Sequence, residues 1–249
     1  MTRAKILVFD SGLGGLSVYR AVKALRPDAD YLYLGDDALF PYGALEPDVL
    51  VARVLEVIGA AMRDFTPDCI IIACNTASTL VLPHLRARYA MPIIGTVPAI
   101  KPAVALTKTG LISVLATPGT VSRDYTQKLI DDFARGVDVT LVGARRLAAL
   151  SEAILRGESV EDAAILSEIA PAFVEKGGKR SDVIVLACTH YPLILDRLEA
   201  LSPWPVKWID PAPAIAKRVV GLIGEVRGMG EGATRMVMTG GAVPSSLVL

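Results

Sequence analysis

Two cysteines stand in closely similar stretches of the sequence. Each follows a short apolar run that ends in alanine, and each precedes two polar residues, in Ala73-Cys74-Asn75-Thr76 and in Ala187-Cys188-Thr189-His190. A thiolate can accept a proton and a thiol can return one, so two cysteines on opposite faces of a carbon atom can exchange the roles of base and acid. This pair therefore predicts the inversion of a carbon centre by proton transfer.

His190 leaves a second chemistry open, because a cysteine with a nearby histidine can be the nucleophile and the base of a hydrolase. The matching surroundings of Cys74 favour the two-cysteine reaction, since a hydrolase needs only one thiolate. A metal site is not expected, because the chain has 2 histidines and His84 lies in a helical pattern. The third cysteine, Cys69, is expected to be buried and unreactive.

A glycine-rich segment, Asp10-Ser11-Gly12-Leu13-Gly14-Gly15-Leu16-Ser17, separates an apolar run from a helical pattern. It does not match the fingerprint of dinucleotide sites, because Ser17 takes the place of the third glycine and Asp10 would repel a pyrophosphate. The backbone N–H groups of such a loop, with Ser11 as an extra donor, suit a carboxylate. The glycines would also serve simply to allow a tight turn and close packing of helix on sheet. The segment alone favours neither interpretation.

Short β-branched runs alternate with longer helical patterns, which is typical of parallel sheets covered by helices on both faces. The expected strands are residues 6–9, 31–34, 70–73, 93–94, 112–115, 139–142 and 183–186, with a further short strand at 235–239. The clearest expected helices are residues 49–65, 78–89, 121–133 and 160–174. The last ten residues are expected to be loose.

Two groups of prolines, within 98–102 and 203–213, mark the expected crossings between two α/β domains. The first domain is expected to comprise residues 1–97 and 211–249, and the second residues 98–210. The echo between the two cysteine segments predicts pseudo-symmetric domains, each a mainly parallel sheet flanked by helices. Each cysteine then lies at the carboxyl end of a strand, where open α/β sheets bind ligands. The active site is therefore expected at the domain interface.

Composition limits the partners and the compartment. Lysine and arginine together number 26, as do aspartate and glutamate, so no overall field favours nucleic acid or an anionic membrane. The start of the chain lacks a signal-peptide core and no apolar run reaches the roughly 20 residues of a membrane span. Three cysteines are too few and too unevenly spaced for a disulfide framework. These features predict a cytoplasmic protein with reduced thiols.

Four motifs resemble those of the bacterial glutamate racemases, members of the cofactor-independent aspartate/glutamate racemase superfamily. They are Val8-Phe9-Asp10-Ser11-Gly12-Leu13-Gly14-Gly15-Leu16, Pro41-Tyr42-Gly43, Ala73-Cys74-Asn75-Thr76-Ala77 and Ala187-Cys188-Thr189-His190-Tyr191-Pro192. Each motif alone is weak, but the four follow the family's order over nearly the whole chain. The resemblance implies two α/β domains that hold glutamate between them, with no pyridoxal phosphate, other cofactor or metal. It also implies a supply of D-glutamate for the peptidoglycan of the cell wall.

The resemblance further implies residue roles. Cys74 would exchange the α-proton of D-glutamate and Cys188 that of L-glutamate, with Asp10 and His190 as assistants. The implied substrate-binding residues are Asp10, Ser11, Pro41, Tyr42, Gly43, Asn75, Thr76, Thr120, Thr189 and His190. The chain departs from the family by having Asp37 and Leu39 where threonine and arginine are usual, which leaves the catalytic set intact.

Other functions stay open at this point. Racemases of aspartate or hydantoins share the two-cysteine architecture, although the Tyr42-Gly43 and Asn75-Thr76-Ala77 matches favour glutamate. The resemblance implies a homodimer. A non-catalytic role, including the interaction with DNA gyrase known for some family members, is disfavoured by the intact cysteines and, for direct nucleic-acid binding, by the neutral net charge.

Overall fold

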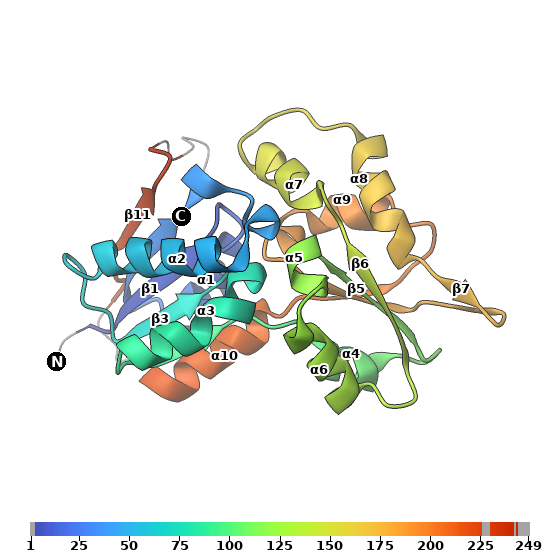
Figure 1. Ribbon diagram of the computed structural model, residues 1–249, viewed down its shortest axis with the longest axis horizontal. Coiled ribbons are helices and arrows are strands. Elements are labelled where there is room, and N and C mark those ends of the chain that lie inside the picture. Colours follow the sequence, from blue (N-terminus) through green and yellow to red (C-terminus); the bar gives the residue numbers. More distant parts are fainter. Residues whose placement is uncertain (1–2, 226–229, 242, 244–249) are drawn as a thin grey trace. The chain divides into compact units, whose positions relative to one another are not determined.

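The computed structural model describes residues 3–225, 230–241 and 243 (Figure 1). By its internal contacts the chain divides into two compact units, of which the first comprises Met1–Thr96 and Ala212–Leu249 and the second Val97–Pro211. Each unit is a parallel sheet with helices packed on it, as the alternation of strand and helix patterns predicts. The domain bounds expected from the sequence, residues 1–97 with 211–249 and residues 98–210, stay a prediction.

The first unit contains a five-stranded parallel sheet in the order β11-β2-β1-β3-β4. Its strands are β1 (Lys5–Asp10), β2 (Asp30–Gly35), β3 (Cys69–Ile72), β4 (Ile93–Gly95) and β11 (Thr234–Met238). Its helices are α1 (Leu16–Leu25), α2 (Pro47–Ala61), α3 (Asn75–Arg88) and α10 (Ala212–Ile223), with the 3-10 turns η1 (Asp37–Leu39) and η2 (Tyr42–Ala44). The helix α2 packs beside α3, and α1 packs beside α10.

The central strands of this sheet are buried on both faces, which explains their continuous apolar sequence. Leu7 and Phe9 of β1 and Ile70 and Ile72 of β3 share one apolar cluster with side chains of α2 and α3, and all four are 0% exposed. Burying one such side chain contributes roughly 1.5–3 kcal/mol. The buried side chains therefore fix the carboxyl ends of β1 and β3. This in turn fixes the position of the polar residues that follow these strands.

The second unit contains a four-stranded parallel sheet in the order β10-β9-β5-β6. Its strands are β5 (Leu111–Ala116), β6 (Asp138–Gly143), β9 (Val183–Ala187) and β10 (Lys207–Ile209), and a separate antiparallel hairpin is formed by β7 (Glu175–Lys176) and β8 (Lys179–Arg180). Its helices are α4 (Ile100–Leu106), α5 (Pro118–Val121), α6 (Asp124–Phe133), α7 (Leu147–Leu155), α8 (Asp162–Ile169) and α9 (Leu195–Ala200), with the 3-10 turns η3 (Ala170–Ala172) and η4 (Tyr191–Ile194).

The two sheets share one connectivity. In the first unit β1 lies between β2 and β3, and β4 continues beyond β3; in the second unit β5 lies between β6 and β9, and β10 continues beyond β9. The strands therefore correspond in chain order, with β11 as an addition to the first sheet. Cys74 follows β3 and Cys188 follows β9, so each cysteine occupies the same topological position in its own unit. This correspondence confirms the pseudo-symmetry expected from the sequence.

All eight expected strands are present, but all four expected helices differ in extent, and the helix expected at 49–65 is observed at Pro47–Ala61. The helix expected from residue 78 begins at Asn75, because the sulfur of Cys74 accepts a hydrogen bond from Ala77 N and acts as an unusual N-cap. The helix expected at 160–174 ends at Ile169 and gives way to a 3-10 turn, since Pro171 lacks a backbone donor.

The prediction of one continuous helix at 121–133 was also wrong in part, because two helices, α5 and α6, lie in this region. The first helix, α5, ends at Val121, and Arg123 adopts an extended conformation before α6 starts. The hydroxyl of Thr126 donates to Thr120 O, so a side chain satisfies a carbonyl that a continuous helix would have used. The hairpin β7–β8 and the short strand β10 had no counterpart among the expected elements.

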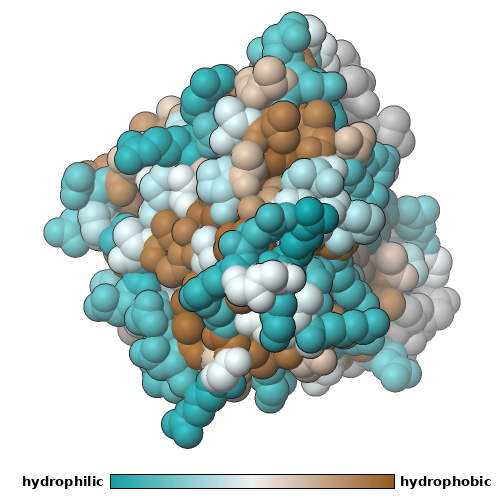
Figure 2. Space-filling model, turned by 90° about the vertical axis from the view of Figure 1, so that its right-hand side faces the viewer, coloured by the Kyte–Doolittle hydropathy of each residue, from teal (hydrophilic) through white to brown (hydrophobic). Residues whose placement is uncertain are grey.

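Among the helices of the described residues, none is both long and apolar enough to cross a bilayer. Figure 2 views the molecule from the side on which the β7–β8 hairpin projects in Figure 1, and its hydrophobic areas are interrupted by hydrophilic side chains. The expected loose tail lies mostly outside the described residues.

Candidate functional site

Cys74 lies at the carboxyl edge of the first sheet, at the start of α3. Parallel pairing of β1 with β3 brings the ends of these strands together, and Ala73 N donates to Phe9 O at 2.7 Å. The Sγ atom of Cys74 lies 3.7 Å from Ser11 Oγ and accepts from Ala77 N at 3.4 Å. Backbone N–H groups at a helix N-terminus favour an anionic sulfur. Cys74 is 5% exposed, so this sulfur is shielded from bulk water.

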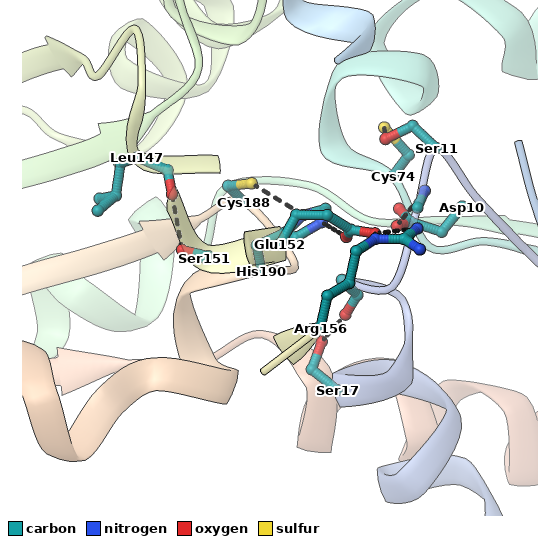
Figure 3. A network of polar contacts seen from close by, with 12 residues as sticks. Asp10, Ser11, Ser17, Cys74, Leu147, Ser151, Glu152, Arg156, Cys188 and His190 are labelled. Atoms are coloured by element: carbon teal, nitrogen blue, oxygen red, sulfur yellow. Dashed lines mark hydrogen bonds and ion pairs between the residues drawn. The ribbon is translucent and has the colours of Figure 1, made fainter. Parts of the chain in front are cut away.

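Asp10 ends β1 beside this cysteine segment and is fully buried (Figure 3). Its carboxylate accepts a hydrogen bond from Gly12 N at 3.1 Å, which folds the glycine loop back over the strand end. A Cβ atom on Gly15 would lie 2.6 Å from Asp10 Cβ and 3.2 Å from Ala73 Cβ. Gly15 is therefore required for the close approach of α1 to the sheet, which supports the packing interpretation for this glycine.

Asn75 is the first residue of α3, and its side chain is 2% exposed. Within the described part of the chain, neither its amide nitrogen nor its amide oxygen has a hydrogen-bond partner. A buried amide without partners costs about 1–3 kcal/mol per unsatisfied group, so such a group usually has a ligand or water to bind. Thr76, the next residue, is also buried at 4% exposure. The two residues supply polar groups directly after Cys74.

Tyr42 lies in the loop after β2, between Pro41 and Gly43. Its ring packs near that of Phe9 with centroids 6.2 Å apart, and its hydroxyl donates to Asp36 at 2.5 Å. Burial, and then the hydrogen bond to Asp36, raise the pKa of Tyr42 far above its ordinary value, so the phenol stays protonated. Asp36, which supports this loop, was not among the residues assigned to the site from the sequence.

Cys188 belongs to the second unit, at the carboxyl end of β9. Its Sγ atom lies 3.8 Å from His190 Nδ1, and His190 Nε2 lies 2.8 Å from a carboxylate oxygen of Glu152 in α7 (Figure 3). The other oxygen of Glu152 accepts from Arg156 Nη2 at 2.8 Å and Nε at 3.1 Å. A carboxylate that accepts from Nε2 leaves Nδ1 as the acceptor nitrogen in the neutral ring, directed to the cysteine. The four residues form a chain that can polarise the thiol of Cys188.

Glu152 was not among the residues assigned to the site from the sequence. Its signal is the spacing of four between Glu152 and Arg156, which places the pair on one face of a helix. Glu152 is 5% exposed and His190 is 2% exposed, so the pair lies in a shielded position. A buried carboxylate on a histidine is an orienting arrangement found in many proton-transfer sites.

The remaining site candidates of the second unit surround the same sheet edge. The register Ala116 with Ala187 in β5 and β9 brings the ends of both strands together. Thr120 is fully buried, and its hydroxyl lies 3.1 Å from that of Thr117. Thr189 is 3% exposed. Burial, followed by the charge of Cys188, raises the pKa of the adjacent Tyr191 well above its ordinary value.

The residues expected at the site thus fall into two groups, one in each unit. The first group contains Asp10, Ser11, Pro41, Tyr42, Gly43, Cys74, Asn75 and Thr76, and the second contains Thr120, Cys188, Thr189 and His190. Cys69 lies at the opposite end of β3, where burial and the charge of Asp68 raise its pKa to about 12. Among the described residues, no three histidine, cysteine, aspartate or glutamate side chains gather in a way that could hold a metal ion.

Comparisons with known proteins agree with the motifs. Residues 13–219 match the family described as Asp/Glu/Hydantoin racemase. A glutamate racemase of Brucella ovis is 54% identical over 219 residues, which cover 88% of this chain and 79% of the relative. A glutamate racemase of Brucella anthropi is 53% identical over the same shares of both chains.

The chain is also similar to solved structures of glutamate racemases. A structure of Escherichia coli glutamate racemase, in complex with L-glutamate and the activator UDP-MurNAc-ala, has a TM-score of 0.86 and 38% identity. That comparison covers 95% of this chain and 88% of the other. The structure of the glutamate racemase isoform RacE1 from Bacillus anthracis has a TM-score of 0.81 and 26% identity, covering 98% and 91%.

Proposed function

Because the chain belongs to the Asp/Glu/hydantoin racemase family and is an amino-acid racemase, we propose that it interconverts L- and D-glutamate with Cys74 and Cys188 as its two acid–base groups. The observation that carries the proposal is the equivalent placement of the two cysteines, each buried at the carboxyl end of the corresponding strand in its own unit. The names of the relatives support glutamate as the substrate. The D-glutamate produced would supply peptidoglycan synthesis.

The reaction needs one thiolate and one thiol at a time. With D-glutamate bound, the Cys74 thiolate removes the α-proton, and the Cys188 thiol donates its own proton to the opposite face of the carbon. The product is L-glutamate, with Cys74 protonated and Cys188 ionised, and the reverse reaction exchanges these roles. No atom is gained or lost and nothing is oxidised.

Negative charge builds on the substrate carboxylate as the α-proton leaves, so donors aimed at that group lower the barrier. In the first unit the amide of Asn75 and the hydroxyl of Ser11 are buried beside Cys74 and suit this task. Asp10 and His190 assist the cysteine of their own unit, and Glu152 orients His190. Shielding of these groups from bulk water increases the strength of each electrostatic interaction.

Incubation of the purified protein with D-glutamate in deuterated buffer, without added cofactor, tests the proposal. We expect loss of optical activity, followed by circular dichroism, together with replacement of the α-proton by deuterium, followed by NMR. Protein without activity toward glutamate, but active toward aspartate or a hydantoin, would reassign the substrate within the family. Hydrolytic activity that requires only Cys188 and His190 would contradict the two-cysteine reaction.

Asn75→Ala should weaken substrate binding without loss of stability. The amide has no partner among the described residues, so its removal leaves no group unsatisfied and relieves a buried polar atom. We expect KM for glutamate to rise by about tenfold or more, the equivalent of one hydrogen bond to a charged group, while Tm is unchanged or higher.

Ser78→Ala is the matched control for Asn75, because Ser78 lies in the same helix but donates to Ile72 O and accepts from Thr96 N, both at 3.0 Å. Its loss should lower Tm and leave KM near that of the unmodified protein. Steady-state kinetics and thermal unfolding of both variants measure the two effects. A lower Tm with unchanged KM for Asn75→Ala would show that the amide is structural.

A further inference from the structure

The loop that carries Tyr42 is held by a single buried carboxylate. Asp36 is 0% exposed, and it accepts from Tyr42 OH at 2.5 Å and from Arg53 Nη2 at 2.7 Å and Nε at 2.9 Å. The hydroxyl of Thr239 donates to the same carboxylate at 2.6 Å. Burial alone would raise the pKa of Asp36, but the hydrogen bonds from Arg53, Thr239 and Tyr42 hold it below its ordinary value. The carboxylate is therefore ionised and binds four donor groups.

Thr239 comes from a distant part of the chain. It directly follows β11 (Figure 1). This edge strand pairs in parallel with β2, in the register Met238 with Gly35. Besides its bond to Asp36, its hydroxyl accepts from Ala38 N at 3.2 Å, and its own N–H donates to Gly35 O at 2.9 Å. Thr239 thus contacts Gly35 at the end of β2 and both Asp36 and Ala38 at the start of the loop.

Gly240 extends this contact. Its N–H donates to the carboxylate of Asp37 at 2.6 Å, and a Cβ atom at this position would lie 2.9 Å from the same oxygen. This hydrogen bond joins the start of the loop directly to the residue pair that follows β11.

We propose that Thr239 and Arg53 are positioning residues that, through Asp36, fix the Tyr42 loop in its substrate-binding conformation, so that the C-terminal strand supports the binding site. This inference rests on the proposed function, together with the substrate-binding role that the family resemblance implies for Pro41, Tyr42 and Gly43. When the loop already has its binding conformation, substrate binding does not have to supply the free energy needed to order it. When the loop is loosened, only a fraction of the molecules has the binding conformation, and the apparent affinity for substrate falls in proportion to that fraction. Loss of the support should therefore raise KM more than it lowers kcat.

Thr239→Val tests the proposal, because valine keeps the shape of threonine but cannot bond Asp36 or Ala38. We expect KM to rise by roughly tenfold for both enantiomers with a smaller change in kcat. Thr239→Ser restores the hydroxyl and should return KM to near its original value. Thr234→Val is the matched control, since Thr234 lies on the same strand and bonds Tyr19 OH at 2.8 Å instead of the loop; it should lower Tm without raising KM.

Hydrogen exchange of the amides in residues 36–45 gives a second readout that does not depend on activity. We expect faster exchange there in Thr239→Val than in Thr234→Val. Equal KM values and equal exchange in these two variants, or no recovery with serine, would overturn the positioning role. If the unmodified protein does not act on glutamate, the proposed function fails, while exchange still decides whether Thr239 holds the loop.

Discussion

Cys74→Ala and Cys188→Ala should each abolish racemisation of glutamate, by about 10³-fold or more, because neither variant retains both the acid and the base that inversion requires. Each should nevertheless keep the chemistry of its remaining cysteine. In deuterated buffer Cys74→Ala is expected to exchange the α-proton of L-glutamate alone, through Cys188, and Cys188→Ala that of D-glutamate alone, through Cys74. NMR of each enantiomer measures this exchange.

An analogue with chloride on the β-carbon extends the test. Removal of its α-proton by one thiolate, with departure of chloride, forms an enamine that hydrolyses to 2-oxoglutarate and ammonia. This elimination needs only one cysteine, so each variant should catalyse it with one enantiomer and not the other. Cys69→Ala is the control, since this thiol is buried at the opposite end of β3. If only one of Cys74 and Cys188 proves essential, the protein is a single-nucleophile enzyme and the hydrolase alternative returns.

The strand positions could be read from the sequence because parallel strands buried on both faces must be continuously apolar, as in Ile70-Ile71-Ile72. The equivalence of the two cysteine segments could also be predicted from the sequence. Equivalent strands that end at a ligand-binding edge of a sheet carry similar residues just beyond that edge. The comparisons confirm the fold and the family. The roles of the individual site residues stay predictions.

Helix limits were harder to predict because single side-chain bonds decide them. The sulfur of Cys74 caps α3, although cysteine is not a usual N-cap residue, and the hydroxyl of Thr126 breaks the helix expected at 121–133. Neither bond has a sequence signature. The sequence pattern therefore predicted which helices exist but not where each of them begins and ends.

Supporting residues were missed for another reason, since they act across long separations in the chain. Glu152 bonds His190 from 38 residues away, and Thr239 bonds Asp36 from 203 residues away. A motif records neighbours in sequence, whereas these bonds exist only once the sheets have formed. Asp36 likewise accepts hydrogen bonds from Arg53, 17 residues away, as well as from Thr239.

Asp10→Asn and His190→Asn should each lower kcat/KM by about 10²–10³-fold, as expected for the loss of an assisting acid–base group. The loss must be equal in both reaction directions, because enantiomers have equal free energies and the equilibrium constant is fixed. The difference between the two variants will instead appear in the primary isotope effects of α-deuterated glutamate. These effects report which of the two proton transfers limits the rate.

Asp10 lies beside the Cys74 segment, so Asp10→Asn raises the barrier for proton transfer at Cys74. The isotope effect on kcat/KM should then grow with α-deuterated D-glutamate and shrink with the L-enantiomer, because the Cys74 step becomes limiting. His190→Asn should give the opposite pattern, since His190 lies 3.8 Å from Cys188. His84→Asn on the exposed face of α3 is the control. Isotope effects that move in the same direction in both variants would show that Asp10 and His190 bind substrate and do not each serve one cysteine.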